Sequence, residues 1–175
     1  MPSVPHTQPA VQPPMATDRP LPGPRLQLAT NTSLAGYVDG GWWPHSLDLS
    51  VELPVLVAGL APRLGVVTMI TFAPEAWQTA PSQLTIAGRG VLLAGSRGQD
   101  PYTVHVSGSD GRQLTLLVIP PEASANPAHR AMMTASRSDN PDRPVAILAA
   151  GDILPDWRVP RLRLVSHDPA SDSRA

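Results

Sequence analysis

The amino-acid sequence predicts an α+β fold: a mostly antiparallel sheet of five to six strands with two helices. Leucines recur at helical spacing between residues 49 and 64. Five segments of strand character follow, joined by short glycine-containing turns. A second helical segment then begins after an Asn-Pro pair. Helices that flank a run of strands are typical of α+β domains.

The 175 residues are enough for one domain and two terminal segments. Residues 1–24 hold eight of the 22 prolines and have no hydrophobic period, which predicts a disordered, polyproline-like arm. Residues 25–140 are expected to form the single α+β domain. Residues 141–175 are expected to be a loosely attached tail, in which the alternation of Arg161 to Val165 after Trp157 suits an edge strand.

The first elements of the domain are a short strand at residues 25–28, turns over residues 31–41, and a long helix. The start of the helix also alternates like a strand, but the longer stripe of five leucines favours a helix. We expect Ser46 as the N-cap, Gly65 as the C-cap and a kink at Pro54. Asp48 and Glu52 suit the positive end of the helix dipole. The stripe comprises Leu49, Leu53, Leu56, Leu60 and Leu64.

The following segments predict five strands in antiparallel succession. Residues 87–90 and 109–112 suit hairpin turns, and the largely apolar segment from Leu114 suits a central strand covered on both faces. Asn126 and Pro127 are expected to open the last helix, which the segment 138–144 interrupts. The expected strands are residues 66–72, 83–87, 91–94, 103–107 and 113–119.

The residue types that are missing exclude several chemistries. The chain has no cysteine, and its basic residues are all arginine. This excludes Schiff-base catalysis, phosphate-loop lysines, thiol nucleophiles and thiolate metal sites. The five histidines are scattered, so we expect neither a metal nor another cofactor. A net charge of -1 and short apolar runs favour a cytoplasmic protein without a nucleic-acid or membrane partner.

The leading candidate site is the glycine-rich stretch around two adjacent tryptophans. Tryptophans on loops often anchor binding surfaces, so Trp43 suits an apolar wall, with polar contacts from nearby side chains. The structural alternative is that the rings fill a core poor in aromatics while the carboxylates satisfy turn and helix amides. The candidates are Asp39, Trp42, Trp43, His45 and Asp48.

The two rings are expected to point to opposite sides, because Pro44 favours an extended backbone at Trp43. One ring should then face the core, and the other should line the surface or a pocket. A second candidate pair is Arg97 and Asp100, which suit an acidic ligand or an ordinary turn. His105 has valines on both sides, which favours a core or edge position over a catalytic one.

Residues 25–137 resemble an uncharacterised actinobacterial domain family. The resemblance rests on Asp39-Gly40-x-Trp42-Trp43-Pro44-x-Ser46, on Glu52-Leu53-Pro54, on Gln99-Asp100-Pro101 and on the segment from Ser109 to Leu116. It implies a soluble bacterial protein and brings no known activity or catalytic residue.

Two functional hypotheses follow from these observations. The first is a non-enzymatic module that binds a small molecule or a protein through the Trp42/Trp43 loop. The alternative is a hydrolase or isomerase, independent of lysine and cysteine, in which His45 and either Asp39 or Asp48 form an acid–base pair. The sequence leaves the ligand and the oligomeric state open.

Overall fold

The computed structural model describes residues 23–30, 36–78, 80–138 and 140–153. The predicted proline-rich arm lies outside the described residues up to position 22. Trp157 and the predicted edge strand at residues 161–165 also lie outside them.

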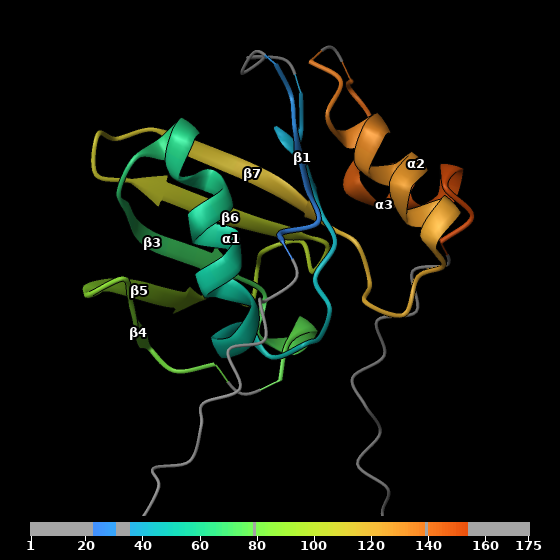
Figure 1. Cartoon of the computed structure of the whole chain (residues 1–175). Coiled ribbons are helices and arrows are strands. Elements are labelled where there is room, and N and C mark those ends of the chain that lie inside the picture. The colour runs from blue at the N-terminus through green and yellow to red at the C-terminus, as the bar shows by residue number, and fades with distance from the viewer. Residues whose placement is uncertain (1–22, 31–35, 79, 139, 154–175) are drawn as a thin grey trace, which may run out of the picture.

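A mixed sheet forms the centre of the described chain (Figure 1). Its seven strands have the order β1-β2-β7-β6-β3-β5-β4, with β2 parallel to β7 and β3 parallel to β5. The α+β class is confirmed, but the sheet is mixed and larger than the five to six strands predicted. The strands are β1 (Leu26–Leu28), β2 (Gly40–Trp42), β3 (Val67–Phe72), β4 (Gln83–Ile86), β5 (Arg89–Gly95), β6 (Thr103–Gly108) and β7 (Gln113–Val118).

Three α-helices accompany the sheet within the described residues: α1 (Leu49–Leu64), α2 (Ala125–Ala135) and α3 (Pro144–Ala150). A 3₁₀ turn, η1 (Pro74–Ala76), precedes β4. The prediction of two helices missed α3. Its buried residues Ile147 and Leu148 pack in the same core as α2, so this part of the expected tail is packed on the domain.

Helix α1 forms where the leucine stripe predicts it, and all five leucines are buried. The expected N-cap is wrong by two residues: Asp48 caps the helix, and its carboxylate accepts from the Ser50 backbone N–H at 2.9 Å. The expected C-cap, Gly65, is confirmed. Pro54 lies inside one continuous helix.

The predicted hairpins are confirmed, whereas the expected succession is wrong at two places, because β3 does not pair with β4 and β5 does not pair with β6. Ala87 and Gly88 adopt positive φ between β4 and β5, as Gly111 does between β6 and β7. However, β4 lies at the edge of the sheet, and β5 returns between β4 and β3. Strand β5 therefore runs parallel to β3.

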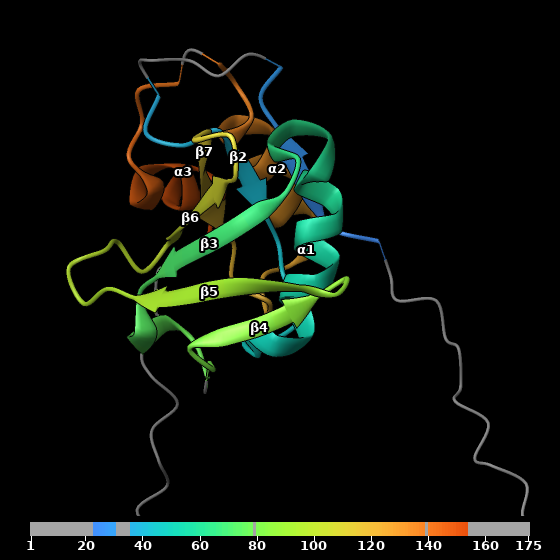
Figure 2. The ribbon, with the colours of Figure 1, turned by 90° about the vertical axis from the view of Figure 1, so that its left-hand side faces the viewer.

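The sheet separates two hydrophobic cores. On one face, α1 packs over the strands, as Figure 1 shows, and Leu116 belongs to this core. On the other face, α2 and α3 pack against the end of the sheet near β2 and β7, where Leu117 lies. Both leucines are fully buried, which confirms that β7 is central and covered on both faces. Figure 2 shows β3, β5 and β4 side by side, beyond the part that α2 and α3 cover.

None of the helices among the described residues has the length and apolar character needed to cross a membrane. The same residues contain no group of three or more side chains suited to holding a metal ion.

Candidate functional site

The glycine pair before the two tryptophans is required by close packing. A Cβ atom at Gly40 would collide with the Gln27 backbone oxygen on β1. A Cβ atom at Gly41 would lie 2.9 Å from the Met132 Cα on α2. Both approaches are too close for any larger residue, so the pair lets β2 insert between its neighbours. Gly40 and Gly41 are thus buried residues of β2 and do not belong to an open loop.

Trp42 and Trp43 point to opposite sides of the extended backbone, as predicted, but neither ring lines the surface. Trp42 is 2% exposed and belongs to the core under α1, whereas Trp43 is 6% exposed and belongs to the core under α2. Trp42 stacks on Trp77, with ring centroids 5.4 Å apart. The expectation that one ring would be exposed is therefore wrong, because a core lies on each side.

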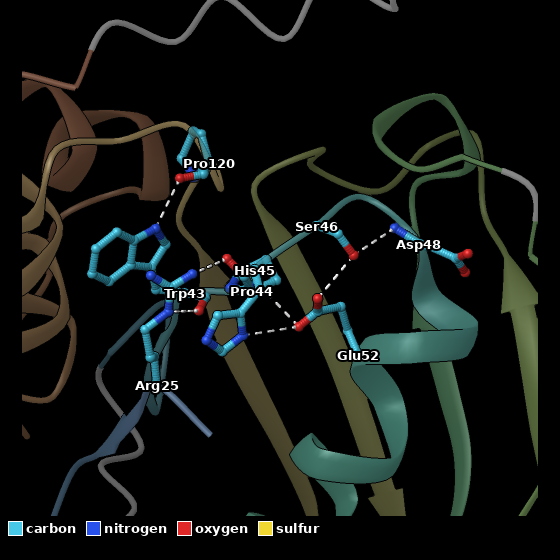
Figure 3. Close-up of polar contacts among 8 residues, drawn as sticks. All are labelled: Arg25, Trp43, Pro44, His45, Ser46, Asp48, Glu52 and Pro120. Atoms are coloured by element: carbon cyan, nitrogen blue, oxygen red, sulfur yellow. Dashed lines mark hydrogen bonds and ion pairs between the residues drawn. The ribbon is translucent and has the colours of Figure 1, made fainter. Parts of the chain in front are cut away.

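Trp43 has a fixed set of neighbours (Figure 3). Its indole N–H donates to the Pro120 carbonyl at 3.1 Å. The Arg25 guanidinium lies over its ring, 3.6 Å from the centroid, and the His129 ring meets it edge-on at 5.7 Å. The guanidinium covers one face of the ring, and the side chain as a whole is buried, so Trp43 offers no open surface to a ligand.

Arg25 also ties β1 to the segment after β2. Its Nε donates to the Trp43 carbonyl at 3.0 Å, and a terminal nitrogen donates to the Pro44 carbonyl at 2.5 Å. Burial of the guanidinium lowers the pKa of Arg25 from its ordinary value, and the negative charge of Glu52 acts in the opposite direction.

Glu52 is the carboxylate at the centre of this network. The side chain is buried, and its oxygens accept from the His45 backbone N–H at 3.1 Å and from the Ser46 hydroxyl at 2.8 Å. The His45 Nδ1 lies 3.6 Å from the same carboxylate, as Figure 3 shows. Ser46, expected as the N-cap, therefore holds Glu52 in place. The sequence assigned Glu52 only to the helix dipole.

The two aspartates of the candidate set have other partners. Asp48 caps α1, as described above. The Asp39 carboxylate accepts from the Thr115 backbone N–H at 2.8 Å, and its own N–H donates to the Thr115 carbonyl at 2.7 Å. Neither aspartate is paired with His45, so the proposed acid–base pair is not formed; the carboxylate beside His45 belongs to Glu52.

The second candidate pair lies in the turn between β5 and β6. Asp100 organises this turn: its carboxylate accepts from the Tyr102 N–H at 2.9 Å, and its carbonyl accepts from the Thr103 hydroxyl at the same distance. Arg97 is exposed, and it makes no hydrogen bond or ion pair with another residue in the described part of the chain.

A polar groove lies next to this turn, on the face of the sheet opposite α1. Strand register places Thr71 beside His105 and His105 beside Thr115, so the three half-buried side chains form one row across the sheet. The groove has a volume of about 570 Å³. Its lining is Tyr37, Thr71, Ser96, Gly98, Gln99, Asp100, Thr103, His105, Thr115 and Pro144.

The walls of the groove are held by hydrogen bonds. His105 Nδ1 lies 2.9 Å from the Thr115 hydroxyl. The Gln99 amide donates to the Thr71 carbonyl at 3.1 Å and to the Thr103 carbonyl at 2.8 Å. The flanking valines predict a core or edge position for His105. The alternation with valines shows that His105 points to the opposite face of the sheet from its neighbours. Only the register between strands shows that Thr71 and Thr115 lie beside it.

The candidate residues thus separate into two places. Asp100 lines the groove, and Arg97 lies between two residues that line it. The Asp39 carboxylate accepts a hydrogen bond from the backbone of Thr115, which also lines the groove. Trp42, Trp43 and Asp48 belong to the packed segment beside α1 and β1, and His45 lies in the same segment with an exposed side chain. His45 is not among the residues that line the polar groove.

Comparison with known proteins gives one match. The model of a family of unknown function, DUF5994, matches residues 25–135. The chain belongs to this family. The DUF5994 match runs from β1 to α2 and includes the tryptophan pair, Glu52 and the polar row, whereas α3 lies beyond it. No curated protein and no solved structure matches the chain.

Proposed function

We propose that this DUF5994 domain is a non-enzymatic binding module that takes a small polar molecule in the groove on the open face of its sheet. The row of Thr71, His105 and Thr115 carries the proposal. These side chains are half-buried, and they line a groove of a size typical of small-molecule sites. Hydroxyl and imidazole groups on a rigid sheet are positioned before a ligand arrives, which lowers the cost of binding.

The lining favours a ligand rich in hydroxyl or amide groups. Tyr37, Asp100 and His105 are the ionisable side chains among the lining residues, and no arginine is among them. An anionic ligand would therefore lack a permanent positive partner in the groove. Tyr37 lines the groove and is 54% exposed, and an aromatic ring suits the apolar side of a polyhydroxylated ligand.

The tryptophan pair has a supporting role in this proposal. Trp42 lies on β2, which pairs with β7, the strand that carries Thr115. Packing of the two rings into separate cores fixes β2, and Asp39 then fixes the backbone of Thr115. The loop thereby positions the groove without contacting the ligand. A protein partner is the remaining alternative for the binding surface.

The enzyme alternative has less support. It required His45 beside Asp39 or Asp48 in a pocket, and these groups have other partners. The His105–Thr115 contact resembles a base beside a hydroxyl, but an activated nucleophile also needs a third group that orients the base. Within the described residues, no hydrogen bond joins His105 to such a group.

A thermal-shift screen with sugars, polyols, nucleosides and organic acids tests the proposal. A compound at 100 times its dissociation constant should add about 2.7 kcal/mol to the stability of the wild type. His105→Ala and Thr71→Val should abolish the shift, because they remove polar groups from the groove. Thr85→Val is the matched control, since Thr85 is an exposed strand residue outside the groove.

Two results would contradict the proposal: no shift with any compound class, or the same shift in the wild type and all three variants. A shift confined to organic acids would contradict the preference for neutral polar ligands. Chemical conversion of the bound compound, detected by chromatography, would favour the enzyme alternative.

A further inference from the structure

An apolar groove lies on the α1 face of the sheet, opposite the face that carries the polar groove. It runs between α1 and the turn that joins β4 to β5 (Figure 2). Its volume is about 360 Å³, which is within the range of small-molecule sites. Its lining comes from residues 54–67 and 86–91, and we call it the α1–hairpin groove. Apart from Arg89, these lining residues are aliphatic, proline or glycine.

The helix wall of the groove consists of small apolar side chains. Pro54, Ala58 and Ala61 follow one another at steps of four and three, so they lie on one face of α1. Ala58 and Ala61 are exposed. The charged residues of α1 have partners elsewhere: Glu52 binds the segment before the helix, and Arg63 donates to backbone carbonyls that follow β1. The wall therefore keeps apolar surface open to a ligand.

The turn between β4 and β5 adds a methyl group to the groove. Ala87 lines the groove with a φ of 50°, and Gly88 follows with a φ of 76°. Two-residue turns with two positive φ angles usually carry Asn, Asp or Gly at the first position. An alanine is strained there, and it puts a methyl group where a polar side chain is usual.

Arg89 brings one positive charge to this apolar surface. It pairs with Ile86 across the hairpin, and opposite residues of an antiparallel pair point to the same face of the sheet. Ile86 is buried in the core under α1, so the Arg89 side chain lies on the α1 face, beside the groove. Arg89 is exposed, and it makes no hydrogen bond or ion pair with another residue in the described part of the chain.

We propose that the α1–hairpin groove binds a small amphiphilic carboxylate, with the hydrocarbon part between α1 and the turn and the carboxylate on Arg89. Burial of the hydrocarbon supplies most of the affinity, since an exposed ion pair contributes little by itself. The planar guanidinium matches the geometry of a carboxylate and selects the charged end of the ligand. This site takes the opposite ligand class from the polar groove, whose lining contains no arginine.

Titration calorimetry of the full chain at low ionic strength tests the proposal with octanoate, 1-octanol and acetate. The wild type should bind octanoate more tightly than octanol, and acetate should not bind measurably. Arg89→Met should weaken octanoate binding roughly fivefold and leave octanol binding unchanged, because it removes only the ion pair. Arg97→Met is the matched control: Arg97 is also exposed, lies outside the groove and should leave both affinities unchanged.

Filling the groove should remove both ligands. Ala58→Phe places a ring against the apolar wall and should abolish binding of octanoate and octanol. Ala149→Phe is the matched control, since Ala149 is an exposed alanine of α3 outside the groove. Circular dichroism and thermal unfolding without ligand check that each variant is folded. His105→Ala should bind octanoate like the wild type, which separates this site from the polar groove.

Four results would overturn the proposal. The first is the absence of octanoate binding to the wild type. The second is an equal loss of octanoate affinity in Arg89→Met and Arg97→Met, and the third is unchanged binding to folded Ala58→Phe. The fourth is a wild-type dimer in sedimentation that Ala58→Phe dissociates, because a second copy of the chain would then occupy the groove.

Discussion

The segment from Asp39 to Glu52 and the polar groove use similar residue types for different purposes. In the segment, each carboxylate has a partner within the chain, and both rings are buried. In the groove, Thr71, His105 and Thr115 keep part of their surface open. The comparison shows that tryptophan, histidine and aspartate do not by themselves mark a binding surface. Side-chain exposure separates the two regions better, with His45 as the exposed residue of the segment.

Substitution of either tryptophan should give the largest effect. Trp42→Ala and Trp43→Ala should each reduce the free energy of unfolding by about 3–5 kcal/mol, because each leaves a large cavity in one of the two cores. Chemical denaturation measures both losses. Leu92→Ala is the control, since Leu92 is 50% exposed on the same sheet, and it should cost much less. A small loss from one tryptophan would show that its ring has the surface role expected from the sequence.

Removal of the Glu52 carboxylate should have the next largest effect. Glu52→Ala should destabilise the protein by about 1–3 kcal/mol, because it leaves the His45 N–H and the Ser46 hydroxyl without their acceptor. Glu75→Ala removes a carboxylate from an exposed position within η1 and serves as the control. Thermal or urea unfolding compares the two variants. Equal, small losses would contradict the central place of Glu52 in the segment.

Local patterns were sufficient for much of the fold. The leucine stripe identified α1, and the turns with positive φ identified both hairpins. Strand β2 was missed because two of its three residues are glycines, which are unfavourable in strands. Glycine is required at both positions because β1 and α2 approach too closely for a side chain. Helix α3 was missed although Pro144 at its first turn is a usual start signal.

The parallel pairs and the polar row depend on contacts between distant residues. Asp39 bonds to Thr115, which lies 76 positions later in the chain, and no local pattern specifies that pairing. Likewise, β5 meets β3 only because β4 takes the edge of the sheet. The extended backbone of the tryptophan pair was predictable. The second core that buries Trp43 was not, because it needs α2 and α3 to pack on the far face.

Substitution of Arg97 should give the smallest effect and separates the two regions most clearly. Arg97→Ala should change the free energy of unfolding by less than about 0.5 kcal/mol, because the side chain is exposed and without a hydrogen bond or ion pair in the described chain. Arg25→Ala is the contrasting variant: it removes the contact with the Trp43 ring and two hydrogen bonds to carbonyls, so urea unfolding should show a loss of about 1–3 kcal/mol. Because Arg97 does not line the groove, its variant should also keep the thermal shift produced by a neutral ligand. A stability loss as large as that of Arg25→Ala would mean that the turn beside the groove is packed like the tryptophan segment.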